Sequence, residues 1–155
     1  MSWVSRISAN PLDPVLIEEA LDHFDKKYAQ GMRELAPEGL LWDKAKMIPG
    51  MQAYWIGTWK ELEAIVELYK IREKAAFTKA YDAYMVSYKS RALSDLQARK
   101  LAEAAPDVLT LMEVRLFFQL RSDQMAGLTT GLQSMHFQLT NLTTLSKENL
   151  EDAMF

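Results

Sequence analysis

A run of cationic side chains between Lys70 and Lys100 is the part of this chain whose residue types could do chemistry. It holds eight Lys and Arg against three Asp and Glu, an excess of five positive charges, whereas the 155-residue chain has a formal charge of −3. Tyr81, Tyr84 and Tyr88 are interleaved with these cations. Cations that contact phosphates, together with flat rings that stack on bases, suit a single strand of nucleic acid.

The candidate nucleic-acid contacts are the cations and tyrosines of this segment. On a helix, Lys70 and Lys74 are four residues apart and Arg72 and Lys79 are seven apart, so several are expected on one lateral surface. The full set of candidates is Lys70, Arg72, Lys74, Lys79, Tyr81, Tyr84, Lys89 and Arg91. In the alternative interpretation, the cations form an ordinary solvated helix face and the tyrosines belong to the core. The segment alone leaves both interpretations open.

The stretch from Leu116 to Leu145, directly downstream, has the opposite character. Its only formal charges are Arg121 and Asp123, yet its residues still indicate a helix. A small domain does not easily cover such a helix by itself, so we expect this helix to self-associate. A cationic face repeated around a ring would then gain avidity without new contacts.

The N-terminal third of the chain predicts one helix followed by a connection. Asp13 accepts from the free N–H groups of a first turn, and Pro14 occupies a position that needs no donor, so a helix begins there. It is expected to end by Pro37. The Pro49-Gly50 pair marks the end of a connection that holds at most one helical turn.

Two long helices and one short helix are expected after this connection. The first long helix runs from about Gln52 to Ser90 and buries an apolar stripe of Trp55, Trp59, Leu62, Val66 and Tyr69. Ser94-Asp95-Leu96-Gln97 has the form of a capping box and begins the short helix. The last helix runs from about Pro106 to Leu142. Its expected apolar stripe is Leu109, Met112, Leu116, Leu120, Leu128, Leu132, Met135, Leu139 and Leu142.

The expected fold class is all-α, because six glycines and five prolines are too few for a loop-rich β architecture. We expect an elongated bundle of three to four helices, with long central and C-terminal helices, that assembles into a ring-like homo-oligomer. Residues 1–155 form one domain. Its parts are an N-terminal helix and connection (1–50), a long basic helix (51–100), an oligomerisation helix (101–145) and an acidic tail (146–155).

Enzymatic, metal-dependent and membrane classes are not expected. There is no cysteine, and neither His23 nor His136 has a second His, Asp or Glu four residues on, so no metal or cofactor is predicted. No nucleophile, base and orienting group can be proposed together. No signal-peptide pattern and no apolar run of membrane-spanning length is visible, which makes the cytoplasm the expected compartment.

Several short motifs occur from Lys79 onward. They are Lys79-Ala80 with Tyr84, Asp107-Val108-Leu109, Phe117-Phe118, Ala126-Gly127 and Phe137. Over roughly residues 54–137, the chain resembles in these motifs the UvsY family of phage recombination mediator proteins. The chain departs from the family pattern in three ways: Tyr81 stands where an arginine is expected, the spacer between the long helices is shorter, and the overall charge is acidic.

The resemblance implies a non-enzymatic, ring-forming oligomer that binds single-stranded DNA during DNA recombination, repair and replication. Such a mediator helps to load a RecA-like recombinase onto strands coated by single-strand binding protein, in the cytoplasm of an infected bacterial host. Lys79 is the DNA contact that the resemblance carries over. The family's C-terminal long helix carries assembly, which makes Phe117, Phe118, Leu128, Leu132 and Met135 the interface candidates. The alternative function is a phage structural or scaffolding protein that acts only through helix–helix contacts.

Overall fold

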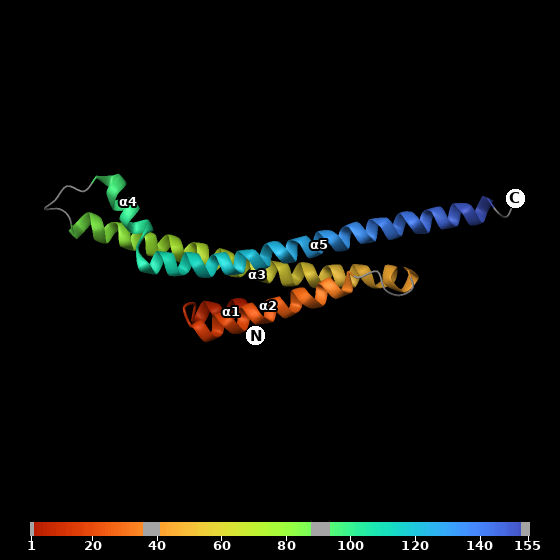
Figure 1. Cartoon of the computed structure of the whole chain (residues 1–155), viewed down its shortest axis with the longest axis horizontal. Coiled ribbons are helices and arrows are strands. Elements are labelled where there is room, and N and C mark those ends of the chain that lie inside the picture. Colours follow the sequence, from red (N-terminus) through yellow and green to blue (C-terminus); the bar gives the residue numbers. More distant parts are fainter. Residues whose placement is uncertain (1, 36–40, 88–93, 153–155) are drawn as a thin grey trace.

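The computed structural model describes residues 2–35, 41–87 and 94–152, and every element in these ranges is an α-helix. The five helices are α1 (Trp3–Ala9), α2 (Pro14–Glu34), α3 (Leu41–Ser87), α4 (Asp95–Glu103) and α5 (Pro106–Asp152). The molecule is elongated: α3 and α5 run side by side in opposite directions, α1 and α2 lie along one side of α3, and α4 lies beside the C-terminal part of α3 (Figure 1). The all-α prediction is confirmed, and the ring-like assembly stays a prediction.

The core lies where α3 meets α2 and α5. Trp55, Leu62, Val66 and Tyr69 of the predicted α3 stripe are buried, and Trp59 is partly buried against them, so this stripe is confirmed. The α3 stripe packs against Phe24 of α2 and, on α5, against Phe118, Met125, Leu128 and Leu132. Burial of these large side chains is the main stabilising contribution that the fold offers.

Two helix starts follow the predicted capping chemistry. The Asp13 carboxylate accepts hydrogen bonds from the backbone N–H groups of Val15 and Leu16, at 3.0 and 3.4 Å. At α4, the Ser94 hydroxyl accepts from the Gln97 N–H at 3.3 Å, while the Gln97 side chain accepts from the Ser94 N–H at 3.1 Å. Both caps satisfy N–H groups that have no partner inside the helix.

The predicted connection before residue 50 is wrong, because α3 already begins at Leu41 and continues through Pro49. A proline inside a helix removes one backbone hydrogen bond. Pro49 and Gly50 are both exposed. Ile48 is buried next to them and Trp55 is buried two turns later, so core packing holds this stretch in the helix.

Two further boundaries differ from the sequence-based expectation. The last helix continues to Asp152, ten residues past the expected end at Leu142. The short helix α1 was not predicted, since its seven residues are too few for a clear periodic pattern. It is nevertheless anchored, because the Ser2 hydroxyl accepts from the Ser5 N–H at 3.2 Å and Ile7 is fully buried.

The predicted buried stripe of α5 is only partly correct. Leu128, Leu132 and Leu139 are buried as expected, and Met135 is partly buried. The remaining buried apolar side chains of the helix are Val108, Leu111, Phe118 and Met125, whereas Leu109, Leu116, Leu120 and Leu142 are exposed. Apolar residues occur on more than one side of this helix, so spacing alone could not choose the side that faces α3.

Candidate nucleic-acid interface

The cations of the basic segment lie on two sides of α3 rather than on one surface. Lys70 and Lys74 are one turn apart and line the same groove toward α5. Nine residues, or two and a half turns, separate Lys70 from Lys79, which places Lys79 on the opposite side. Lys89 and Arg91 lie outside the described residues. The expected single cationic face is therefore divided by the helical repeat.

Arg72 is used inside the fold. Its guanidinium donates a hydrogen bond to the Ser8 carbonyl at 2.9 Å, and its Nε is buried without a hydrogen-bond partner among the described residues. Ser8 belongs to the last turn of α1, and a cation at that end of a helix is favoured by the helix dipole. Arg72 thus joins α3 to α1 and is turned away from the groove that contains Lys70 and Lys74.

That groove lies where α3, α4 and α5 meet and encloses about 430 Å³. We call it the basic groove and define it by Lys70, Lys74, Phe77, Met112 and Arg115. Glu73 and Glu103 also line it, so the groove carries both signs of charge with an excess of one cation. Phe77 and Met112 add apolar surface on which a base could rest.

The lysines of the basic groove differ in how they are paired. Lys70 pairs with Glu67 at 2.6 Å, one turn away on the exposed side of α3. Lys74 has no ion-pair partner within the described ranges. An exposed ion pair of this kind contributes about 0–1 kcal/mol, so Lys70 can leave Glu67 for a phosphate at little cost. Lys74 could contact a phosphate without first leaving a carboxylate.

Arg115 has a more structural position in the groove. Its Nε donates to the Glu73 carboxylate at 2.7 Å, and the two side chains are only 21% and 24% exposed. Removing one partner would leave the other charge partly buried and unpaired, which is costly. We therefore assign Arg115 to the junction between α3 and α5, and not to the exposed cations that could contact a phosphate.

The aromatic side chains beside the groove form a step of two parallel rings. Phe77 and Tyr81 lie one turn apart, with ring centroids at 6.3 Å and planes inclined by 17°. The Tyr81 hydroxyl donates to Asp95 of α4 at 2.5 Å, and this hydrogen bond raises the pKa of Tyr81. Tyr84, one turn further along α3, is half-buried. Tyr81 and Tyr84 are thus neither fully buried in the core nor fully exposed to solvent.

Helix α4 adds one cation, Arg99, next to this aromatic step. Asp95 of α4 contacts Tyr81, and Glu103 at the other end of α4 lines the basic groove, so α4 lies along the same stretch of α3. Arg99 and Lys100 are both exposed on α4. Arg99 pairs with Asp95 at 3.0 Å, whereas Lys100 has no ion-pair partner among the residues that the structure describes.

Three contributors to this surface were missed from the sequence: Phe77, Arg99 and Arg115. Phe77 could have been found, because it stands three residues after Lys74 and four before Tyr81, on the same helix face. Arg99 belongs to the basic segment but follows the break before α4. Arg115 is 42 residues away from its partner Glu73, and no local pattern predicts that contact.

The five interface candidates on α5 are placed differently by the structure. Phe118, Leu128 and Leu132 are buried in the core of the chain itself, and Met135 is partly buried against it. Phe117 is 51% exposed. The assumption that the chain cannot cover this helix is therefore wrong for one side, which α3 and α2 cover. The exposed apolar side chains of α5 are Leu109, Leu116, Phe117, Leu120, Phe137, Leu142 and Leu145.

Within the described ranges, no helix combines the length and apolar character needed to cross a membrane, and no cluster of potential metal ligands is found. The chain matches no protein-family model, no curated protein and no solved structure. The fold and the site together define an elongated all-α protein with a cationic, aromatic surface at the junction of α3, α4 and α5 and an exposed apolar side on α5.

Proposed function

We propose that this chain is a recombination mediator protein without enzymatic activity. In this proposal it binds single-stranded DNA and promotes loading of a RecA-like recombinase onto strands coated by single-strand binding protein. The observation that supports it best is the gathering of Lys70, Lys74 and Phe77 in the basic groove, with Tyr81 stacked on Phe77. Exposed lysines can neutralise phosphates, and neighbouring rings can stack on bases without selecting a sequence.

The cationic surface of one chain is small, so the proposal includes self-association. Most nearby cations are paired with carboxylates, and the whole chain carries a net charge of −3. A single copy would bind DNA weakly, whereas several copies held in one particle would bind through linked contacts. The exposed apolar side of α5, which includes Leu109, Leu116 and Leu120, supports such an assembly.

The replacement of both lysines by alanine tests the DNA contact. We expect Lys70→Ala with Lys74→Ala to weaken binding of a fluorescent oligonucleotide for all sequences alike, because both lysines line the basic groove and would contact phosphates. For each phosphate that the particle no longer neutralises, the slope of log affinity against log salt should fall by ~0.7. Fluorescence anisotropy at two salt concentrations measures both effects.

Lys26→Ala with Lys60→Ala is the matched control, since these lysines lie on α2 and on another part of α3 and pair with Asp22 and Glu63. The control should bind as the parent protein does. If the parent protein does not bind the oligonucleotide at low salt, or if both double variants lose affinity equally, the proposed surface is wrong.

A phage structural or scaffolding protein is the second candidate. The exposed apolar side chains of α5 favour it, because they predict protein contacts whether or not DNA binds. This candidate predicts an oligomer that leaves a labelled oligonucleotide free at low salt. The mediator predicts an oligomer that carries the oligonucleotide with it.

A further inference from the structure

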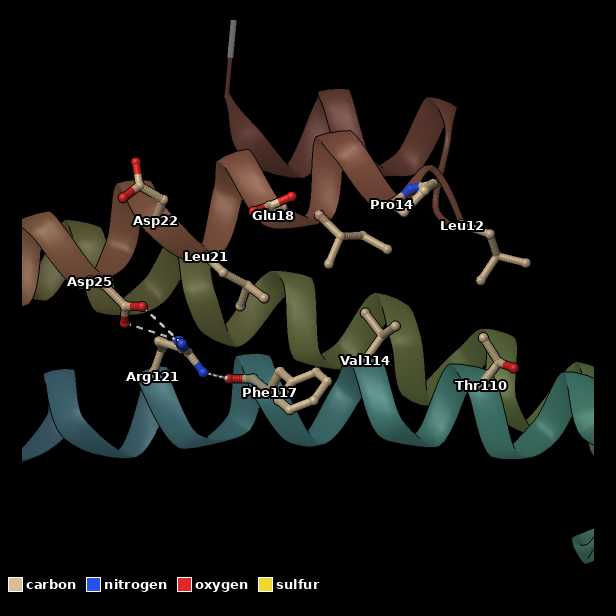
Figure 2. Close-up of a pocket in the computed structure, with 11 residues that line it drawn as sticks. Leu12, Pro14, Glu18, Leu21, Asp22, Asp25, Thr110, Val114, Phe117 and Arg121 are labelled. Atoms are coloured by element: carbon tan, nitrogen blue, oxygen red, sulfur yellow. Dashed lines mark hydrogen bonds and ion pairs between the residues drawn. The ribbon is translucent and has the colours of Figure 1, made fainter.

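An open groove between α2 and α5 has a chemistry opposite to that of the basic groove. It encloses about 530 Å³, with Ile17 and Leu21 of α2 on one wall and Val114 and Phe117 of α5 on the other. Helix α3 lies behind these walls, and the side chains point into the space between the two ribbons (Figure 2). We call it the acidic groove because of the carboxylates described below.

The acidic groove has a closed end and an open end. At the closed end, the Arg121 guanidinium donates to both carboxylate oxygens of Asp25, at 2.8 and 3.0 Å, and links α5 to α2 (Figure 2). Leu12 and Thr110 line the open end. The α5 wall from Thr110 to Arg121 is about 16 Å long, or three helical turns, at ~1.5 Å per residue. This length matches one short helix.

The lining of this groove is apolar and incompletely covered. Leu12 is 52% exposed and Phe117 is 51% exposed, although both are large apolar side chains. The helices α1, α2, α3 and α5 already surround the core, with α1 packed on α2 and α3 and with α5 packed on α2 and α3. A further helix laid over the groove between α2 and α5 would cover Leu12, Phe117 and Val114 by ordinary helix packing.

Carboxylates on α2 define the charge of the occupant. Glu18, Asp22 and Asp25 recur at four and three residues and all line the groove. Asp25 forms an ion pair with Arg121. Asp22 pairs with Lys26, and the side chains of Asp22 and Lys26 are both more than half exposed. Glu18 has no ion-pair partner in the part of the chain that the structure describes. The α2 wall therefore repels phosphates and attracts cations.

Helices α4 and α5 of a second copy complement the groove poorly. Helix α4 balances Arg99 and Lys100 with Asp95 and Glu103, and Leu96 is its most exposed leucine. From Leu116 to Leu145, α5 has a single cation, which already pairs with Asp25. A second copy docked through α5 would thus leave Glu18 and Asp22 without cationic partners.

We infer that the acidic groove is a docking site for a basic amphipathic helix of a different protein. The partner helix spans about three turns, places apolar side chains against Phe117 and Leu21, and turns Lys or Arg toward Glu18 and Asp22. This inference does not depend on the DNA-binding proposal, because the two grooves lie on different helix pairs and differ in charge.

The probe is a fluorescein-labelled amphipathic peptide of about 14 residues, or roughly four turns, with Leu on one face and Lys on the other. The same peptide with Glu in place of Lys tests the role of charge. Anisotropy should show saturable binding of the Lys peptide and none of the Glu peptide. Two independent changes should each weaken binding by about tenfold: Glu18→Gln with Asp22→Asn, and Phe117→Ser.

Matched controls separate the groove from general effects. Glu63→Gln with Asp82→Asn removes the same two acid types from α3, where Glu63 is half-buried and Asp82 is exposed, and Ile71→Ser removes an exposed apolar side chain there. Both controls should bind the Lys peptide as the parent protein does. The Glu18→Gln with Asp22→Asn variant should keep oligonucleotide binding, so that a failure here is distinct from a failure of the proposed function.

Three results would overturn the inference. The first is that binding of the Lys peptide does not saturate, or that the Glu peptide binds as tightly as the Lys peptide. The second is that the control variants weaken binding as much as the groove variants. The third is that Phe117→Ser converts an oligomer into smaller particles. The last result would show that a second copy covers the groove. Because Phe117→Ser and the double acid change act through different chemistry, either one decides the question if the other fails to fold.

Discussion

At the scale of single residues, Tyr69 links three parts of the core. Its ring stacks on Phe118 of α5, with centroids 5.7 Å apart, and its hydroxyl donates to the Pro11 carbonyl at 2.7 Å, just before α2. Burial raises the pKa of Tyr69 to about 12 from an ordinary value of 10.0. The folded state therefore keeps this proton over a pH range in which the unfolded chain loses it.

This raised pKa predicts a loss of stability at alkaline pH. Tyr69 stabilises the fold fully below pH 10.0, and its contribution falls as the pH rises toward about 12, by about 1.4 kcal/mol per pH unit. Tyr69→Phe should lower the free energy of unfolding by about 1 kcal/mol at about pH 9, because the hydrogen bond to Pro11 is removed. Between about pH 9 and pH 11, however, the variant should lose less stability than the parent protein. Urea denaturation at the two pH values measures this. Equal losses in both proteins would contradict the assigned role.

Gly31 lies where α2 approaches Leu128 of α5 closely. A Cβ at position 31 would overlap Leu128 Cδ2 and lie 3.2 Å from Leu128 Cγ, and Leu128 is buried with little room to move. A Cβ at Gly57 of α3 would meet nothing within 4 Å. The two glycines therefore offer a matched comparison.

We expect Gly31→Ala to destabilise the fold by about 1–3 kcal/mol, because it overpacks the contact with Leu128. Gly57→Ala should stabilise it by about 0.4–1 kcal/mol through reduced entropy of the unfolded chain. The free energies of unfolding from urea titration test both. If the two substitutions change stability alike, then α2 does not approach α5 in the way described.

At the scale of the helices, α4 depends on its capping box. Ser94→Ala removes the side chain that accepts from the Gln97 N–H and should destabilise α4 by about 1 kcal/mol. Amide hydrogen exchange should become faster in α4 and stay unchanged in α2. Ser134→Ala, at an exposed position inside α5, is the control. Unchanged exchange in α4 would show that core packing through Ala98 and Ala102 holds this helix without the cap.

Helix starts and the α3 face could be predicted from the sequence because their causes are local. Asp13 and Ser94 cap their helices through contacts within three residues, and the α3 stripe follows from one regular spacing. The helix through Pro49 and the buried side of α5 could not be predicted, since contacts with distant residues decide both. The ion pair of Arg115 with Glu73 and the contact of Arg72 with Ser8 have the same non-local origin.

At the scale of the whole molecule, composition and periodicity were sufficient for the all-α class and the long helices. They were not sufficient for the candidate site, because the helical repeat divides the basic segment between two sides of α3, and because α4 brings Asp95 and its partner Arg99 next to Tyr81 only in the folded chain. The interface candidates Phe118, Leu128 and Leu132 belong to the core for a related reason, since the burial of α5 depends on its partner helix.

The central claim is that several copies of this chain join through α5 and together hold a single strand. Size-exclusion chromatography with light scattering, at micromolar protein and low salt, tests it in one experiment with and without a fluorescent oligonucleotide. We expect a particle of several chains that elutes together with the oligonucleotide. A single chain of 17.8 kDa that elutes apart from the oligonucleotide would contradict the proposal.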